Sequence, residues 1–187
     1  MKSPLYFIVK PTESKRYNNT KQISGIEIIV NTSEEDYKFS NRHAVVIEVP
    51  LGYSGPICPG DTLIVHHNAF KFYNDIKGRR KSGKSFFRED IFFIEDDQFF
   101  MFKNSEGWHA YDRYCFVSPV LATESYIKKP FTEEPLIGIM RYPNKYLMSQ
   151  GVMEGDSVCF APDSEYEFNI DGEKMYRIFD HQIAIKL

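Results

Sequence analysis

The sequence contains only three cysteines among its 187 residues, and no two of them have CxxC spacing. So few cysteines, in an odd number and without metal-ligand spacing, argue against a disulfide framework and fit reduced thiols. The longest early apolar run, residues 5–9, is too short for a signal-peptide core or a membrane span. We therefore expect a cytoplasmic protein without a membrane partner.

The chain also lacks an excess of basic residues and any clustering of groups that bind metals or perform catalysis. Its net charge of −3 argues against general nucleic-acid binding. His66 and His67 are adjacent, so in a strand they point to opposite faces and do not share one metal ion. His43, His109 and His181 have no ligand spacing with the cysteines. Serine, histidine and acidic residues are scattered, so we expect no metal, no cofactor, no catalytic residues and no enzymatic activity.

One motif suggests nucleotide chemistry, because residues 78–85, GRRKSGKS, satisfy the P-loop pattern GxxxxGK[ST]. A P-loop requires a strand before it and a long helix after it, whose N-terminus holds the phosphates. Only five residues separate Ser85 from the apolar segment that begins at Ile91. That distance leaves no room for a helix and a crossover. We interpret the motif as the tip of a solvated basic hairpin, with its role open.

The chain does contain an internal repeat, organised around a Gly-Asp corner followed by a strand. Gly tolerates positive φ and Asp hydrogen-bonds to its own backbone, while β-branched and aromatic residues favour the strand that follows. Four blocks recur in the same order. The matched segments are 6–11 with 114–119, 45–50 with 137–143, 59–65 with 154–160, and 90–98 with 174–182.

The repeat predicts two small all-β domains, residues 1–108 and 109–187, since the chain is long enough for two domains of just under a hundred residues. Short apolar runs closed by turn residues predict strands, and Asp171-Gly172 predicts a hairpin turn. Residues 146–152 are polar and mixed, and we expect no amphipathic helix in the chain.

Two segments of the first repeat have no counterpart in the second. Residues 12–33 are a polar stretch without periodicity that contains an apolar cluster, SGIEIIVNTS at residues 24–33. An ordinary edge strand is an alternative interpretation of this cluster. Residues 71–85 form a basic insertion. The first repeat therefore carries both of the additional elements.

A strand, a long polar loop with an apolar tripeptide, a second strand, a Gly-Asp corner and a closing Asp-x-Gln strand together resemble the GroES co-chaperonin family. The resemblance covers most of both halves and implies two tandem GroES-like small β-barrels with a long mobile loop, residues 12–33, in the first. In that family a Gly-flanked apolar tripeptide of the loop docks on the chaperonin. It implies that the docking residues are Gly25, Ile26, Ile28, Ile29 and Val30.

The function implied by this resemblance is that of a co-chaperonin that caps a GroEL-type chaperonin ring and assists ATP-dependent protein folding. The chaperonin is then the partner that binds ATP. Because only one barrel has the loop, we expect a homo-oligomer of seven subunits with stacked barrels, in the host cytoplasm if the chain is viral. The barrels lie side by side in the alternative, plastid-like arrangement.

Two other functions remain open. One is a viral structural or assembly protein of the same barrel type that never binds a chaperonin. The other is a phosphate or nucleic-acid binder that uses the basic insertion, which contains Arg79, Arg80, Lys81 and Lys84.

Overall fold

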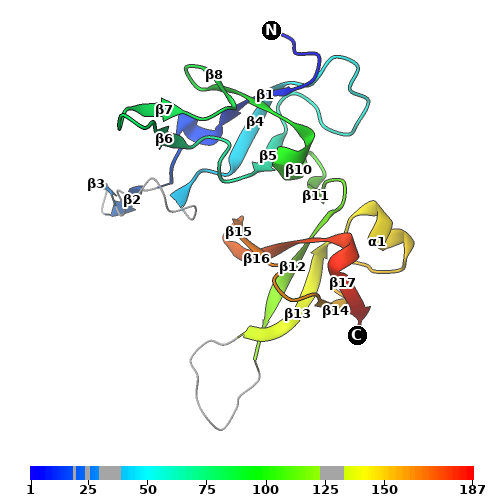
Figure 1. Cartoon of the computed structure of the whole chain (residues 1–187). Coiled ribbons are helices and arrows are strands. Elements are labelled where there is room, and N and C mark those ends of the chain that lie inside the picture. Colours follow the sequence, from blue (N-terminus) through cyan, green and yellow to red (C-terminus); the bar gives the residue numbers. More distant parts are fainter. Residues whose placement is uncertain (19, 24–25, 30–38, 123–132) are drawn as a thin grey trace. The chain divides into compact units, whose positions relative to one another are not determined.

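The computed structural model describes residues 1–18, 20–23, 26–29, 39–122 and 133–187, with side chains given outside residues 21–27 (Figure 1). The chain is mostly β, as the sequence predicts, and divides into two compact units, Met1–Gly107 and Trp108–Leu187. The described parts contain no helix that is both long and apolar enough to cross a membrane.

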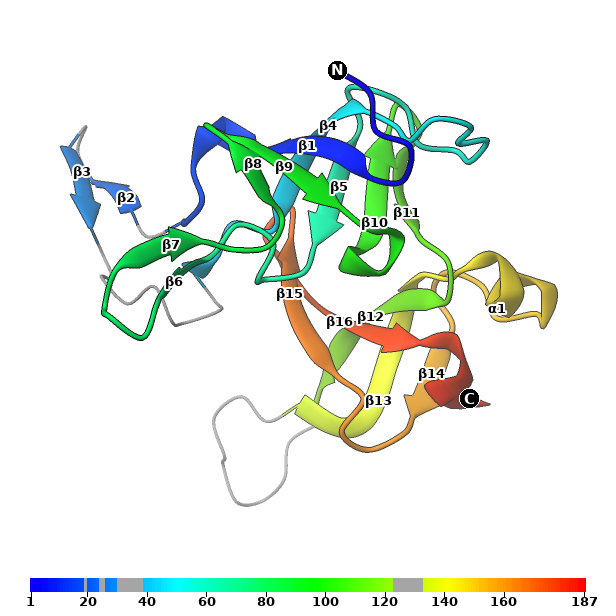
Figure 2. The same cartoon turned by 45° about the horizontal axis from the view of Figure 1, so that its top comes forward.

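The first unit is built on a seven-stranded sheet with the order β11-β10-β5-β4-β1-β9-β8. Its strands are β1 (Phe7–Pro11), β4 (His43–Glu48), β5 (Thr62–Val65), β8 (Phe86–Arg88), β9 (Ile91–Ile94), β10 (Phe99–Asn104) and β11 (Gly107–Ala110). Two separate hairpins accompany this sheet (Figure 2). They are β2 (Thr20–Ile23) with β3 (Ile26–Ile29), and β6 (Phe72–Asn74) with β7 (Arg80–Ser82).

The second unit contains a six-stranded sheet with the order β15-β16-β12-β13-β14-β17. Its strands are β12 (Tyr114–Leu121), β13 (Glu133–Tyr142), β14 (Ser157–Phe160), β15 (Tyr166–Ile170), β16 (Glu173–Phe179) and β17 (Ile183–Lys186). It also contains one short α-helix, α1 (Lys145–Ser149), and a 3-10 turn, Asp180–Gln182. The helical turn of α1 was not predicted from the sequence, and it starts where the Asn144 side chain accepts a hydrogen bond from the Leu147 amide.

The two sheets repeat the same sequence of strand pairings. The first strand of each unit pairs with two others: β1 pairs with β4 and β9, and β12 pairs with β13 and β16. In both units this first strand has an irregular register at the same place, between Ile8 and Val9 and between Phe116 and Val117. The internal repeat of the sequence is therefore also a repeat of topology and register.

The pairing corrects one of the sequence alignments. Val9 lies opposite Val46 in the first unit, and its counterpart Val117 lies opposite Met140 in the second. Val46 therefore corresponds to Met140, whereas the sequence comparison had aligned Val45 with Ile137. The strands are alternating apolar segments of similar composition, so residue type alone did not determine the register.

The Gly-Asp corner has the same hydrogen bonds in both units. The Gly60 amide donates to the Val46 carbonyl and the Val46 amide donates to the Asp61 carbonyl, both at 2.8 Å. Gly155, Met140 and Asp156 repeat this arrangement, again at 2.8 Å.

Both glycines of the two corners adopt positive φ, 99° in the first unit and 88° in the second. This conformation suits glycine, because it has no Cβ. The corner thus places β5 against β4 and β14 against β13 in equivalent registers.

Neither sheet forms the closed barrel that the sequence led us to expect. Among the described residues, β8 and β11 are the edge strands of the first sheet, and β15 and β17 those of the second. The sheets are short-stranded, and register irregularities bend them instead. In the second unit the core combines sheet residues with two from the helical segment. Its buried members are Cys115, Val117, Met140, Leu147, Val152, Val158, Phe160 and Ile178.

A buried carboxylate connects three parts of the second unit. The side chain of Asp180 is only 3% exposed and accepts hydrogen bonds from Arg113 Nη2 at 2.7 Å and Asn144 Nδ2 at 3.1 Å. Burial alone would raise the pKa of Asp180. The hydrogen bonds from Arg113 and Asn144 lower it by more than burial raises it, so the pKa lies below its usual value of 3.8. The ionised carboxylate is therefore the form that the fold stabilises.

We predict that Asp180→Asn lowers the free energy of unfolding of the second unit by about 2 kcal/mol at neutral pH, because it removes a charge-assisted, buried interaction. Urea unfolding measures this change, with the exposed Glu165→Gln as a control that leaves stability nearly unchanged. Because the folded-state pKa is lowered, the contribution is present above about pH 4 and disappears as the pH falls through the folded-state value. A difference between wild type and variant that persists undiminished at pH 2 contradicts this assignment.

Candidate functional site

The apolar cluster predicted to dock on a partner lies on the β2–β3 hairpin. Thr20 pairs with Ile29 and Lys21 pairs with Ile28, and β3 pairs with no strand of the seven-stranded sheet among the described residues. Part of the stretch predicted as an unpatterned loop is therefore a hairpin, because polar β2 residues provide a partner for the apolar β3 segment. Ile26–Ile29 is a strand, as the alternative interpretation has it, but it lies in a two-stranded sheet and not at the edge of the seven-stranded one.

Two of the five predicted docking residues have described side chains. Ile28 is 43% exposed and Ile29 is 62% exposed. Adjacent strand residues point to opposite faces, so the hairpin presents apolar surface on both sides. Ile26 begins β3, but its side chain is outside the description, and Gly25 and Val30 lie outside the described residues. The predicted mobility of residues 12–33 stays a prediction.

The chain segments on either side of this hairpin are held together at its base. Tyr17 and Ser40 form an isolated β-bridge, and the Asn18 amide donates to the Phe39 carbonyl at 2.7 Å. The Asn41 side chain adds to the base, with Nδ2 donating to the Lys15 carbonyl at 2.7 Å. Sequence reasoning missed this base, since its residues are polar and far apart in the chain.

The basic insertion is a hairpin, in agreement with the sequence interpretation. Phe72 pairs with Ser82 across β6 and β7, and the turn is closed by Asp75, whose Oδ1 accepts from the amides of Lys77 and Arg79 at 2.9 Å. The P-loop pattern extends over this turn, β7 and the residues up to Ser85. Strand β8 follows it and no helix begins there, so the loop and helix N-terminus that cradle phosphates are not formed.

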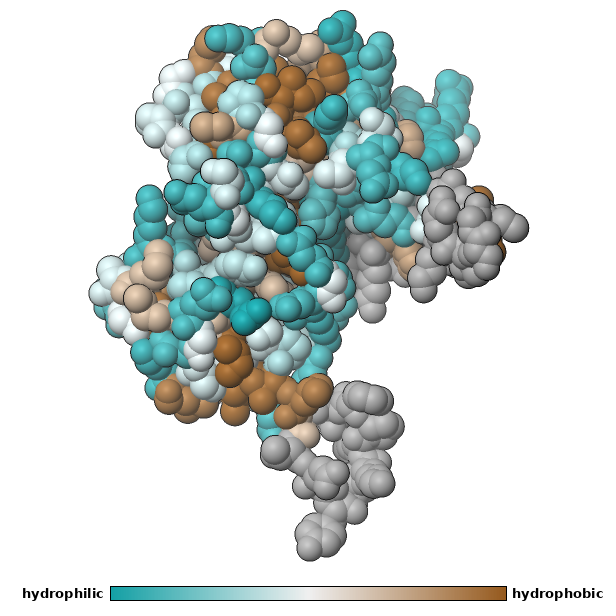
Figure 3. Space-filling model, turned by 180° about the vertical axis from the view of Figure 1, so that it is seen from behind, coloured by the Kyte–Doolittle hydropathy of each residue, from teal (hydrophilic) through white to brown (hydrophobic). Residues whose placement is uncertain are grey.

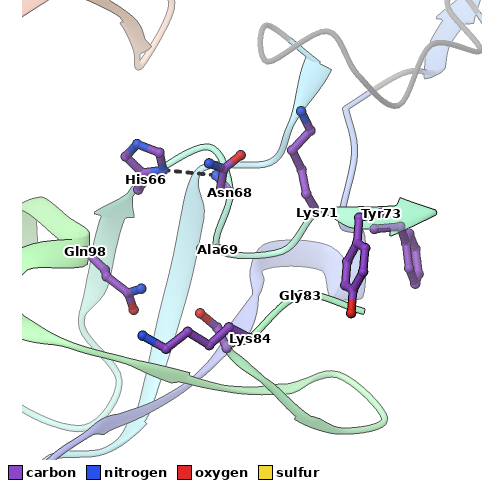
Figure 4. Close-up of a pocket in the computed structure, with 10 residues that line it drawn as sticks. His66, Asn68, Ala69, Lys71, Tyr73, Gly83, Lys84 and Gln98 are labelled. Atoms are coloured by element: carbon purple, nitrogen blue, oxygen red, sulfur yellow. Dashed lines mark hydrogen bonds between the residues drawn. The ribbon is translucent and has the colours of Figure 1, made fainter. Parts of the chain in front are cut away.

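A cavity of about 400 Å³ lies where this insertion joins the sheet (Figure 4). Its lining residues are His66, Asn68, Ala69, Lys71, Phe72, Tyr73, Gly83, Lys84, Ser85 and Gln98. Lys84 extends toward Gln98 in Figure 4, and its ammonium group lies 3.6 Å from the Glu95 carboxylate. The cavity thus has the ion-paired Lys84 among its lining residues.

One of the two adjacent histidines near this cavity, His67, has a lowered pKa. Burial and the neighbouring His66 lower the pKa of His67 to about 4, so His67 is uncharged at neutral pH. His66 Nδ1 accepts a hydrogen bond from the Asn68 amide at 3.2 Å. No group of three or more potential metal-ligating side chains occurs in the portion of the chain described.

Exposed apolar side chains are not confined to the β2–β3 hairpin. Figure 3 shows apolar surface, coloured brown, on the displayed faces of both units. Ile76 at the tip of the basic hairpin is fully exposed, and Leu121 and Ile185 in the second unit are 65% and 56% exposed. Ile28 and Ile29 are adjacent on a strand of a hairpin outside the main sheets, whereas Ile76 lies in the turn of the other such hairpin, between β6 and β7.

A scan of the chain against models of protein families finds no match, and a search of curated proteins finds no significantly similar sequence.

We predict that Lys84→Ala leaves the stability of the protein nearly unchanged, within about 0.5 kcal/mol, because its ion pair is solvent-exposed. We also expect the purified protein not to hydrolyse ATP, since the P-loop geometry is missing. Thermal unfolding and a phosphate-release assay test both expectations. ATP hydrolysis that is present in the wild type and lost in Lys84→Ala contradicts the second one.

Proposed function

We propose that this protein is a co-chaperonin, which caps a GroEL-type chaperonin ring through the β2–β3 hairpin and assists ATP-dependent protein folding. The observation that carries the proposal is the exposure of Ile28 and Ile29 on a hairpin that has no pairing with the main sheet among the described residues. The resemblance of the sequence to the GroES family, with each unit in the role of a GroES-like domain, supports it.

The physical mechanism follows from the size of the apolar contact. Burying one isoleucine side chain in a partner contributes about 1.5–3 kcal/mol, so a single hairpin binds weakly and reversibly. Fixing the hairpin on the partner also costs conformational entropy, which reduces the net gain. Several hairpins on one ring overcome this limit, because after the first has bound the others bind intramolecularly at high effective concentration. In this scheme the partner's ATP cycle sets when the cap binds and leaves.

The second candidate is an assembly protein with the same pair of units and no chaperonin partner. A specific feature favours it, namely the outer edge of the second sheet. Ile185 on β17 lies opposite Cys159, which in turn lies opposite Ile137 on β13. Ile185 and Leu187 are 56% and 64% exposed. An apolar edge of this kind suits association between subunits with or without a chaperonin.

We predict that changing Ile28, Ile29 and Val30 together to serine abolishes binding to a GroEL-type chaperonin while the fold is retained. The two described isoleucines contribute about 2 kcal/mol each when buried, and the loss is multiplied over all hairpins of a ring. The measurement is co-sedimentation with the chaperonin, with and without ATP.

Leu121→Ser is the matched control for this variant, because Leu121 is equally exposed but lies in the second unit. The control should bind as well as the wild type. Binding by the triple variant that equals the wild type eliminates the hairpin as the docking element. If the wild type itself does not bind, the assembly function becomes the better proposal.

We further predict that seven subunits act together, either as a free heptamer or as seven chains on one face of the chaperonin. Each subunit supplies one docking hairpin, so a seven-membered chaperonin ring is matched only if seven subunits bind with their first units toward it. Native mass spectrometry of the free protein and of the complex tests this number. A stable tetramer, or equivalent ring positions for both units, favours the side-by-side arrangement instead.

A further inference from the structure

The chain between residues 17 and 40 carries the β2–β3 hairpin and is called the docking segment. Its base is held by an arginine whose guanidinium lies between aromatic rings. The guanidinium carbon of Arg16 lies 4.1 Å from the ring centroid of Phe72 and 4.8 Å from those of Phe86 and Phe92. Its Nη1 donates a hydrogen bond to Ser82 Oγ at 2.9 Å. Arg16 therefore contacts both strands of the basic insertion, β6 through Phe72 and β7 through Ser82.

Tyr17 makes a second connection to the same strand. Its hydroxyl oxygen accepts a hydrogen bond from the Phe72 amide at 2.9 Å, and the two rings are stacked with centroids 6.3 Å apart. The guanidinium of Arg80, on β7, lies 3.8 Å from the centroid of the Phe72 ring. Phe72 is thus the residue at which the insertion and the base of the docking segment meet.

The returning arm of the segment is attached to the same two residues. Ser40 bridges to Tyr17, and the Asn41 amide donates to the Arg16 carbonyl at 3.0 Å. Through Arg16 and Tyr17, the insertion holds both arms. The ends of the segment are then fixed at residues 17 and 40, rather than at the ends of the flanking strands, Pro11 and His43.

The long connection between β1 and β4 and the β6–β7 insertion both belong to the first unit, and the second unit has a shorter connection at each of the two places. In the second unit, β14 and β15 are joined by the short connection 161–165, where the Ser164 hydroxyl donates to the Ala161 carbonyl. The connection between β12 and β13 is likewise shorter than that between β1 and β4. A unit without the long segment therefore also lacks the insertion.

We propose that the β6–β7 insertion is a buttress that positions the docking segment, with Arg16, Tyr17 and Phe72 as its positioning residues. This inference rests on the proposed co-chaperonin function, because it assigns the insertion a role in the same docking event. Because both arms are held at residues 17 and 40, the part of the chain that must be ordered on docking is shorter than the whole connection between Pro11 and His43. A shorter chain loses less conformational entropy when the β2–β3 hairpin docks.

Hydrogen exchange of the free protein tests the buttress without any partner. In Phe72→Ala we expect the amides of Asn18 and Asn41, which close the base, to exchange about tenfold faster, because the stacking contacts of Arg16 and Tyr17 are lost. Phe72→Tyr keeps the ring and should restore wild-type exchange. Tyr73→Ala, an exposed neighbour on the same strand, is the matched control and should have no effect.

Two further measurements make the test specific. Tyr17→Phe removes only the hydroxyl that accepts from the Phe72 amide, so it should accelerate exchange at Phe72 while the rings stay stacked. The amide of Val46, which donates to the Asp61 carbonyl in the main sheet of the first unit, reports whether a variant has unfolded that unit as a whole. Unchanged exchange at Asn18 and Asn41 in Phe72→Ala overturns the buttress.

Binding to the chaperonin with ATP then separates this inference from the proposed function. We expect the affinity of the assembled Phe72→Ala ring for the chaperonin to be about tenfold lower than that of the wild type, chiefly through slower association. Phe72→Tyr should bind normally. Equal binding by wild type and Phe72→Ala, with exchange accelerated, overturns the positioning role. If the wild type fails to bind while exchange responds as expected, the co-chaperonin function fails and the buttress stands as an anchor of the segment.

Discussion

The reciprocal hydrogen bonds between the Gly-Asp corner and the facing strand are the constraint on which both sheets depend. Gly60 and Gly155 have positive φ, which lets the chain turn sharply at each corner. The glycine amide and the carbonyl of the following aspartate then both hydrogen-bond to one residue of the facing strand, Val46 in the first unit and Met140 in the second. This arrangement fixes the register of the second pair of strands, and with it the residues that face the core. β10 and β17 pair in turn with the strands that follow the two corners, β5 and β14.

The parts of the fold that could be predicted are those encoded by neighbouring residues. Turn chemistry and apolar runs located most strands, the repeat and the hairpin nature of the basic insertion, because these depend on local φ and side-chain alternation. The single turn of α1 was missed because one cap, Asn144, starts it in a polar stretch. At the candidate site, Ile28 and Ile29 stood out in sequence, but the contact of Arg16 with Phe72 joins residues far apart in the chain. No local pattern marks such a contact.

The two units show how a repeated framework is made unequal without disturbing its core. The second unit joins β14 to β15 by the short connection 161–165 and buries Asp180 between Arg113 and Asn144. At the corresponding place the first unit has the exposed Asp96, and it extends two connections instead. Both extensions leave the strand order intact, because each lies in a connection and replaces no strand of the sheet. The β2–β3 hairpin lies between β1 and β4, and the basic insertion lies between β5 and β8. The first unit thus carries its additional elements in connections, where the sheet tolerates them.

An exposed apolar hairpin presents a conflict between reach and affinity. A long, unattached segment reaches a partner easily but loses much entropy when its tip is fixed, whereas a rigid one must already point at its target. Anchoring the base while leaving the tip outside the main sheet is a compromise between the two. Arg16 suits this task, because one planar group stacks on several rings and still donates a hydrogen bond to Ser82. Lysine, a point charge on a flexible stem, offers no such combination of contacts.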